Sequence, residues 1–169
     1  MKSGISFFAL LLLLVSINLQ SCRYSLKGIS IPEGTQNFYV APFGNNASSG
    51  PADLGQVFRE RLRDQIRRDT RLSETEIDPN IEFTGYINSF RIEQIAPQPG
   101  EFSAANELTI SIFVEYTNHL DEEVGFSKTY SENAQFASDA NLLSIQDNLV
   151  DEIYAIILEK VFNDAFTNW

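Results

Sequence analysis

Arginine is concentrated in one short segment of this sequence. Residues 59–71 hold six arginines, and four of them are spaced by four: Arg59, Arg63, Arg67 and Arg71. Residues with this spacing line up along one side of a helix. Because a guanidinium donates paired hydrogen bonds to phosphate or carboxylate, the ridge predicts contact with an acidic ligand. The alternative is a solvated helix face, neutralised by Glu60, Asp64 and Asp69. Arg91 and Lys128, on predicted strands, are two further candidate contacts.

The only cysteine, Cys22, follows an apolar segment near the N-terminus. Ile5 to Val15 is apolar and shorter than the roughly 20 residues of a transmembrane helix. Leu19-Gln20-Ser21 precedes the cysteine and resembles a bacterial lipoprotein processing site, although Gln20 replaces the usual small residue. We therefore predict that residues 1–21 are a signal peptide and that Cys22 is acylated. The alternative is an ordinary secretory signal.

The remaining reactive side chains predict no enzyme. The single histidine, His119, precedes the acidic run Asp121-Glu122-Glu123 and is expected to be a turn residue rather than a metal ligand. The sequence has no GxSxG motif and no glycine-rich loop of the phosphate-binding type. Its carboxylates are scattered over predicted loops and helix surfaces, so no glycosidase-type pair is indicated. We expect no catalytic residue, no metal and no cofactor.

The composition excludes one class of partner and indicates how the chain is organised. The formal net charge of −11 excludes nucleic-acid binding through the overall electrostatic field. One cysteine excludes an internal disulfide. Thirteen Phe, six Tyr and one Trp indicate a packed domain rather than a disordered chain. We predict a single domain over residues 36–169, joined to Cys22 by a tether over residues 22–35.

Two helices are predicted from apolar residues at three- and four-residue spacing. The first spans residues 51–70 and presents Leu54, Phe58, Leu62 and Ile66 on one side. The second is about 25 residues long and is expected to begin at a cap formed by Ser138 or Asp139. Its inner row is Leu142, Ile145, Leu149, Ile153, Ile157, Val161 and Ala165. Both helices must cover an apolar surface.

Predicted strands supply the apolar surface that the two helices cover. Alternating or β-branched segments predict strands over residues 37–43, 81–92, 106–117 and 124–136. The last three are joined by connections too short for parallel crossovers, so they predict an antiparallel meander. The expected fold is α+β, a two-layer sandwich in the order β-α-β-β-β-α. It has a mostly antiparallel four-stranded sheet with two long helices on one face.

Several segments together resemble the Bacteroidetes form of the LptE family of lipopolysaccharide-assembly lipoproteins. They are Tyr24-Ser25 with Gly28 and Ser30-Ile31-Pro32, then Pro42-Phe43 with Asn46-Ala47, and finally Asp151-Glu152-Ile153 through Asn168-Trp169. The resemblance covers nearly all of the chain after Cys22. It implies an outer-membrane lipoprotein that assembles with and plugs an LptD-type β-barrel translocon. Lipopolysaccharide is then a candidate ligand.

The predicted sheet offers one independent support for this resemblance. The face opposite its apolar side carries mostly Thr, Ser, Asn and Glu, with Tyr86, Phe90 and Phe113 among them. A barrel lumen is polar, so a protein inside it should present a polar surface with a few aromatic anchors. We therefore predict that these three aromatics, together with Trp169, face the barrel. An ordinary solvent-facing sheet is the alternative.

Three functions from different classes remain open. The first is the translocon partner just described. The second is an auxiliary lipid-binding lipoprotein of another envelope lipid-transport system. The third, a surface-exposed binding lipoprotein, is disfavoured because no acidic run follows Cys22. In Bacteroidetes-type bacteria such a run resembles a surface-export signal, and its absence favours the periplasmic side of the outer membrane.

Overall fold

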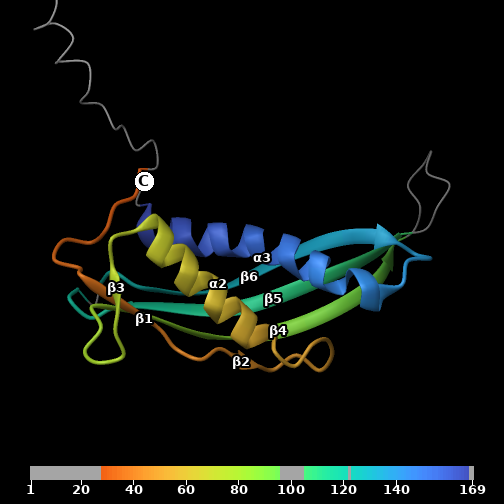
Figure 1. Ribbon diagram of the computed structural model, residues 1–169, viewed down its shortest axis with the longest axis horizontal. Coiled ribbons are helices and arrows are strands. Elements are labelled where there is room, and N and C mark those ends of the chain that lie inside the picture. Colours follow the sequence, from red (N-terminus) through yellow and green to blue (C-terminus); the bar gives the residue numbers. More distant parts are fainter. Residues whose placement is uncertain (1–27, 96–104, 122, 168–169) are drawn as a thin grey trace, which may run out of the picture.

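The computed structural model describes residues 28–95, 105–121 and 123–167. Cys22 and Trp169 lie outside these ranges. Along the chain the elements are β1 (Asn37–Val40), β2 (Gly44–Asn45), α2 (Leu54–Asp69), β3 (Ser73–Glu74), β4 (Ile81–Ile95), β5 (Ala105–Asn118), β6 (Phe126–Ala137) and α3 (Leu142–Phe166). Both helices lie on the same side of the sheet, α3 running along the strands (Figure 1). The predicted α+β class and its two helices are confirmed.

The sheet is mixed rather than mostly antiparallel. Strands β4, β5 and β6 form the predicted antiparallel meander, whereas β1 runs parallel to both β3 and β4. The order is β3-β1-β4-β5-β6, and β2 pairs in parallel with β4. Within the described residues the sheet therefore has six strands, not the predicted four. Strands β2 and β3 are two residues long, which is too short to produce a periodic pattern in the sequence.

The core lies between the helices and one face of the meander. On β5 the predicted alternation holds, and Leu108, Ile110, Ile112, Val114 and Tyr116 are all buried. Opposite them, α2 buries Leu54, Phe58, Leu62 and Ile66, and α3 buries a longer row centred on Ile153 and Ile157. Fully burying an aliphatic or aromatic side chain of this size contributes about 1.5–3 kcal/mol before entropy is subtracted. Apolar periodicity therefore predicts correctly which face of β5, α2 and α3 turns inward.

A bulge in β4 overturns one prediction. The pairing between β4 and β5 shifts between Ile87 and Ser89, so Asn88 is an extra residue in β4. Beyond the bulge the two faces exchange, and Phe90 turns into the core with 4% of its surface exposed. The prediction that Phe90 lies on the polar face is therefore wrong. A two-residue alternation read straight through the strand cannot register the inserted residue.

The start of α3 also differs from the prediction. Its N-cap is Asn141, whose side-chain oxygen accepts a hydrogen bond from the backbone N–H of Leu143. Ser138 and Asp139 precede the helix and do not cap it. All three residue types satisfy a free N–H well, so composition alone could not choose among them.

The described part of the predicted tether is attached to the domain. The Ser30 N–H donates a hydrogen bond of 2.6 Å to the carbonyl oxygen of Phe166 at the end of α3. Ile29 and Ile31 are partly buried against the core. The chain therefore enters the domain beside the C-terminal end of α3 (Figure 1).

Candidate functional site

The polar face of the sheet, away from the helices, carries an aromatic pair. We call this surface the open face. Tyr86 on β4 and Phe113 on β5 are direct cross-strand partners. Their ring centroids are 5.1 Å apart, and the ring planes differ by 24°, so the rings are stacked. Both side chains are partly exposed. The structure thus brings together two of the three strand aromatics that the sequence predicted on this face, in a geometry that cross-strand pairing favours.

A carboxylate is held next to this pair. Glu115 lies two residues from Phe113 on β5 and is flanked by Thr84 on β4 and Ser127 on β6. The Thr84 hydroxyl donates to one carboxylate oxygen at 3.3 Å, and the Ser127 hydroxyl donates to the other at 3.4 Å. Sequence reasoning did not single out Glu115. The alternation of β5 places Glu115 on the same face as Phe113, and this pattern in the sequence could have indicated it.

Small polar side chains make up the rest of the open face on β6. They are exposed and alternate with the residues that face α3: Ser127, Thr129, Ser131, Asn133 and Gln135. Such a surface can form many hydrogen bonds but offers no nucleophile paired with a base. Among the described residues, no group of three His, Cys, Asp or Glu could hold a metal ion. His119, at the end of β5, lies 3.1 Å from a Glu82 carboxylate oxygen.

The arginine ridge is only partly formed. Arg59 Nε donates a hydrogen bond of 2.8 Å to the carbonyl oxygen of Val40 on β1. Arg63 and Arg67 both lie 3.9 Å from a Glu74 carboxylate oxygen on β3. Arg71 stands beyond the end of α2 and is exposed. Three of the four arginines thus face the neighbouring strands, where they have partners within the protein.

Lys128 and Arg91 lie on opposite sides of the sheet. Arg91 is on the open face, with a guanidinium nitrogen 3.7 Å from Glu93. Lys128 is on the helix side, where its ammonium donates to Asp164 of α3 at 2.7 Å. The Tyr130 hydroxyl donates to the same Asp164 oxygen at 2.8 Å. Burial acts to raise the pKa of Asp164, but these two hydrogen bonds outweigh it, and the pKa falls below its ordinary value. Lys128 therefore joins α3 to β6.

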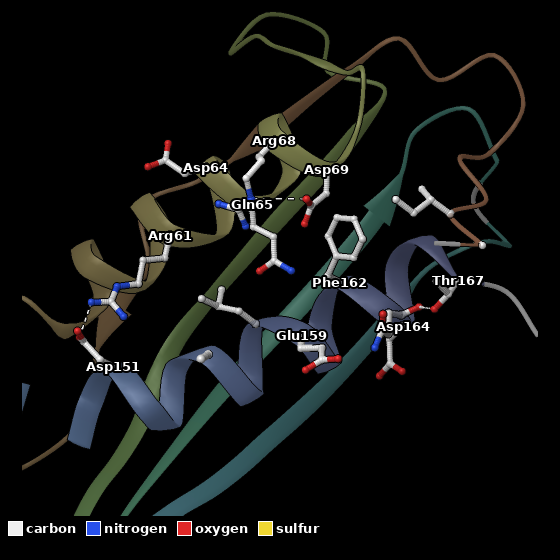
Figure 2. A pocket seen from close by; sticks show the side chains of 15 residues that line it. Arg61, Asp64, Gln65, Arg68, Asp69, Asp151, Glu159, Phe162, Asp164 and Thr167 are labelled. Carbon is white, nitrogen blue, oxygen red and sulfur yellow. Dashed lines mark hydrogen bonds and ion pairs between the residues drawn. The ribbon is translucent and has the colours of Figure 1, made fainter. Parts of the chain in front are cut away.

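A groove of about 1060 Å³ runs between α2 and α3. An ion pair between Arg61 and Asp151 joins the two helices across it (Figure 2). Its walls carry Asp64 and Glu159, and Phe162 contributes an apolar surface. Sequence reasoning missed this groove because it depends on the angle between two helices.

The chain has no helix, within the part that the structure describes, that is long and apolar enough to cross a membrane. Cys22, the predicted lipidation site, and Trp169, a predicted barrel contact, lie outside that part. Both assignments therefore remain predictions.

The fold is a two-layer α+β domain whose sheet has one polar face that the helices leave open (Figure 1). A comparison with known families identifies the family. The LptE family model, described as lipopolysaccharide-assembly, matches residues 35–165. This match covers well over half of the chain, which therefore belongs to the LptE family. No curated protein matches the chain.

Two of the similar solved structures share the fold at low sequence identity. A putative neuraminyllactose-binding hemagglutinin homolog from Helicobacter pylori aligns with a TM-score of 0.54 and 10% identity, covering 83% of this chain and 91% of that one. The hypothetical protein CT253 from Chlamydia trachomatis aligns with a TM-score of 0.50 and 8% identity, covering 79% and 99%. Rare lipoprotein B from Shewanella oneidensis gives a TM-score of 0.40 and 13% identity, covering 76% and 90%.

Proposed function

We propose that this protein is an outer-membrane lipoprotein that assembles with and plugs an LptD-type β-barrel during lipopolysaccharide insertion. The observation that carries the proposal is the open face of β4, β5 and β6 in a member of the LptE family. A barrel lumen is lined by polar side chains and water, so a polar face with few apolar residues can lie in it without a desolvation penalty. In this arrangement Tyr86 and Phe113 face the lumen.

The membrane anchor follows from Cys22. We propose that residues 1–21 are removed and that the acylated cysteine holds the domain at the periplasmic side of the outer membrane. Only five residues separate Cys22 from Gly28, where the described chain begins beside the end of α3. The fifteen residues of β4 span about 50 Å at roughly 3.3 Å per residue. The hairpin of β4 and β5 thus reaches away from the anchored end (Figure 1).

Co-purification tests the partnership. The full-length protein, tagged at its C-terminus, is expected to bring a large β-barrel with it in equal amounts from detergent-solubilised outer membranes. Depleting the protein is expected to lower surface lipopolysaccharide. If no barrel co-purifies, the translocon proposal fails, and the auxiliary lipid-transport function is favoured instead.

Membrane attachment has a separate test. Cys22→Ala should move the protein from the membrane fraction to the soluble fraction, because several acyl chains provide the stable anchoring. Ser21→Ala is the matched control, since it keeps a small residue before the cysteine. Continued membrane association of the Cys22→Ala protein would contradict lipidation.

Direct contact with lipopolysaccharide through the arginines has its own test. Arg67 is more than half exposed, and Arg71 lies just beyond α2. The double variant Arg67→Glu and Arg71→Glu is expected to weaken binding to purified lipopolysaccharide, because it places carboxylates where phosphates would sit. Arg68→Glu, which changes a charge on the groove side of α2, is the control. Unchanged binding by the double variant would remove this contact from the proposal.

A further inference from the structure

We propose that Tyr86, Phe113 and Glu115 form a binding site for a neutral saccharide on the open face. The inference deepens the proposed function and rests on it, since a face turned to the lumen would meet the saccharide part of a passing glycolipid. The chemistry of the site, however, is argued from the side chains themselves and can be tested on the isolated protein.

The aromatic pair supplies an apolar platform. The two rings are stacked, with centroids 5.1 Å apart and planes that differ by 24°, so each fixes the orientation of the other. Both side chains stay partly exposed and together form one apolar patch. The sheet below them is covered by helices on its other side, so the platform is fixed in place (Figure 1). A pyranose ring has an apolar face of C–H groups that can pack on such a surface and release water from both. An apolar patch of two partly exposed rings favours the C–H groups of a sugar over a phosphate, which has no apolar surface.

Glu115 supplies the polar recognition. An ionised carboxylate has about four lone-pair sites, and the Thr84 and Ser127 hydroxyls use one on each oxygen. The remaining sites can accept hydrogen bonds from two neighbouring hydroxyl groups of a sugar. The residue lies two positions from Phe113 on the same face, which is about 7 Å along the strand. This distance allows a single ring stacked on Phe113 to reach the carboxylate.

The charge of the open face selects a neutral ligand. Glu82 and Glu115 lie on the same side of the sheet as the aromatic pair. Arg91 is the one lysine or arginine on the open face of β4, β5 and β6. It lies five residues from Tyr86, and a carboxylate oxygen of Glu93 is close to its guanidinium. A phosphorylated or acidic sugar would be repelled by Glu115 without a nearby cation to offset it. This site therefore differs in chemistry from any phosphate contact made by the arginines of α2.

Binding of oligosaccharides to the purified full-length protein in detergent tests the inference. The neutral probes are cellohexaose, mannohexaose and chitohexaose, and the acidic probe is hexagalacturonate. We expect at least one neutral hexaose to bind, as measured by saturation-transfer NMR and calorimetry. Hexagalacturonate should bind at least about tenfold more weakly, which corresponds to about 1.4 kcal/mol.

Variants assign the binding to the proposed residues. Tyr86→Ala and Phe113→Ala should each weaken binding about tenfold through loss of stacking area. Glu115→Gln keeps the shape of the side chain, so it should weaken binding while leaving the unfolding midpoint nearly unchanged. Tyr39→Ala is the matched control. Tyr39 on β1 pairs with Glu82, which lies on the same side of the sheet and four residues before Tyr86 on β4. Removing the Tyr39 ring should have little effect on saccharide binding.

Two results would overturn the inference. One is the absence of binding by all three neutral hexaoses. The other is an equal loss of binding in Tyr39→Ala and in Tyr86→Ala. If no saccharide binds but Tyr86→Ala abolishes barrel co-purification, the open face is a protein interface, and only the saccharide site is rejected. If saccharides bind and no barrel co-purifies, the saccharide site stands and the translocon partnership fails.

Discussion

The hydroxyl of Tyr154, in the middle of α3, donates a buried hydrogen bond of 3.0 Å to the carbonyl oxygen of Leu54 in the first turn of α2. The same ring packs edge-on against Phe58, with centroids 5.3 Å apart. Burial is the main cause that raises the pKa of Tyr154, so the hydroxyl keeps its proton throughout the physiological range. The Tyr154 side chain thus fixes where α3 lies along the length of α2.

Tyr154→Phe tests this connection. It removes the hydroxyl while keeping the ring contact with Phe58, and it should lower the free energy of unfolding by about 1 kcal/mol. Urea denaturation, followed by circular dichroism, measures the change in midpoint. A midpoint equal to that of the unmodified protein would show that the hydrogen bond contributes nothing to stability.

Gly55 allows α2 to lie close to the backbone that follows β1. A Cβ at this position would come within 2.3 Å of the Phe43 carbonyl oxygen, which is a backbone atom and cannot rotate away. Gly55→Ala should therefore lower the free energy of unfolding by about 1–3 kcal/mol. At Gly44 the nearest atom to an added Cβ, the Tyr86 Cβ, is 3.4 Å away. Gly44→Ala is thus the control, and an equal loss in both variants would argue against the close approach.

Asn141 is expected to set the start of α3. Replacing it with alanine removes the acceptor for the Leu143 N–H and should cost about 1 kcal/mol of unfolding free energy. Asp139→Ala lies two residues earlier, outside the helix, and should have a much smaller effect. Thermal unfolding of the two variants compares the caps directly. The sequence-based assignment would be restored if Asp139→Ala were the more destabilising.

Asp164 should make stability depend on acid pH. Its pKa is lowered in the folded protein, so its contribution is present above the ordinary value of 3.8 and is lost as the pH falls through the lowered pKa. The difference in unfolding free energy between the unmodified protein and Asp164→Asn should therefore shrink as the pH is reduced from about 7 to about 3. Urea unfolding at both pH values measures it. A difference that grows on acidification would contradict the proposed role of Lys128 and Tyr130.

Much of the fold could be predicted because its long elements have clear periods. The fourteen residues of β5 alternate between core and open face throughout, and α3 keeps one apolar side over 25 residues. Family membership was also recoverable, although only from weak matches in the right order. The candidate site was half predicted, since Tyr86 and Phe113 were placed on one face but Glu115 and its two hydroxyl partners were not singled out.

The failures have a common physical origin. Phe90 points into the core because β4 has one extra residue, Asn88, opposite β5. Strands β2 and β3 form only because β4 and β1 lie beside them in the sheet. The contacts of Arg59 with Val40 and of Arg63 with Glu74 were likewise not predictable, because they depend on how α2 lies beside β1 and β3. Each outcome is decided by a contact between segments distant in the chain. Contact of the arginines with an acidic ligand stays a prediction.

The sequence alone determined the class of fold, the inward faces of β5, α2 and α3, and the family, because apolar periodicity and residue order are local properties of the chain. The tertiary structure alone decided the stacking of Tyr86 on Phe113, the fixing of Glu115 and the partners of the arginines. These depend on strand register and helix placement, which are set by how distant segments pack together. The chemistry proposed for the open face therefore rests on pairings that no local pattern encodes.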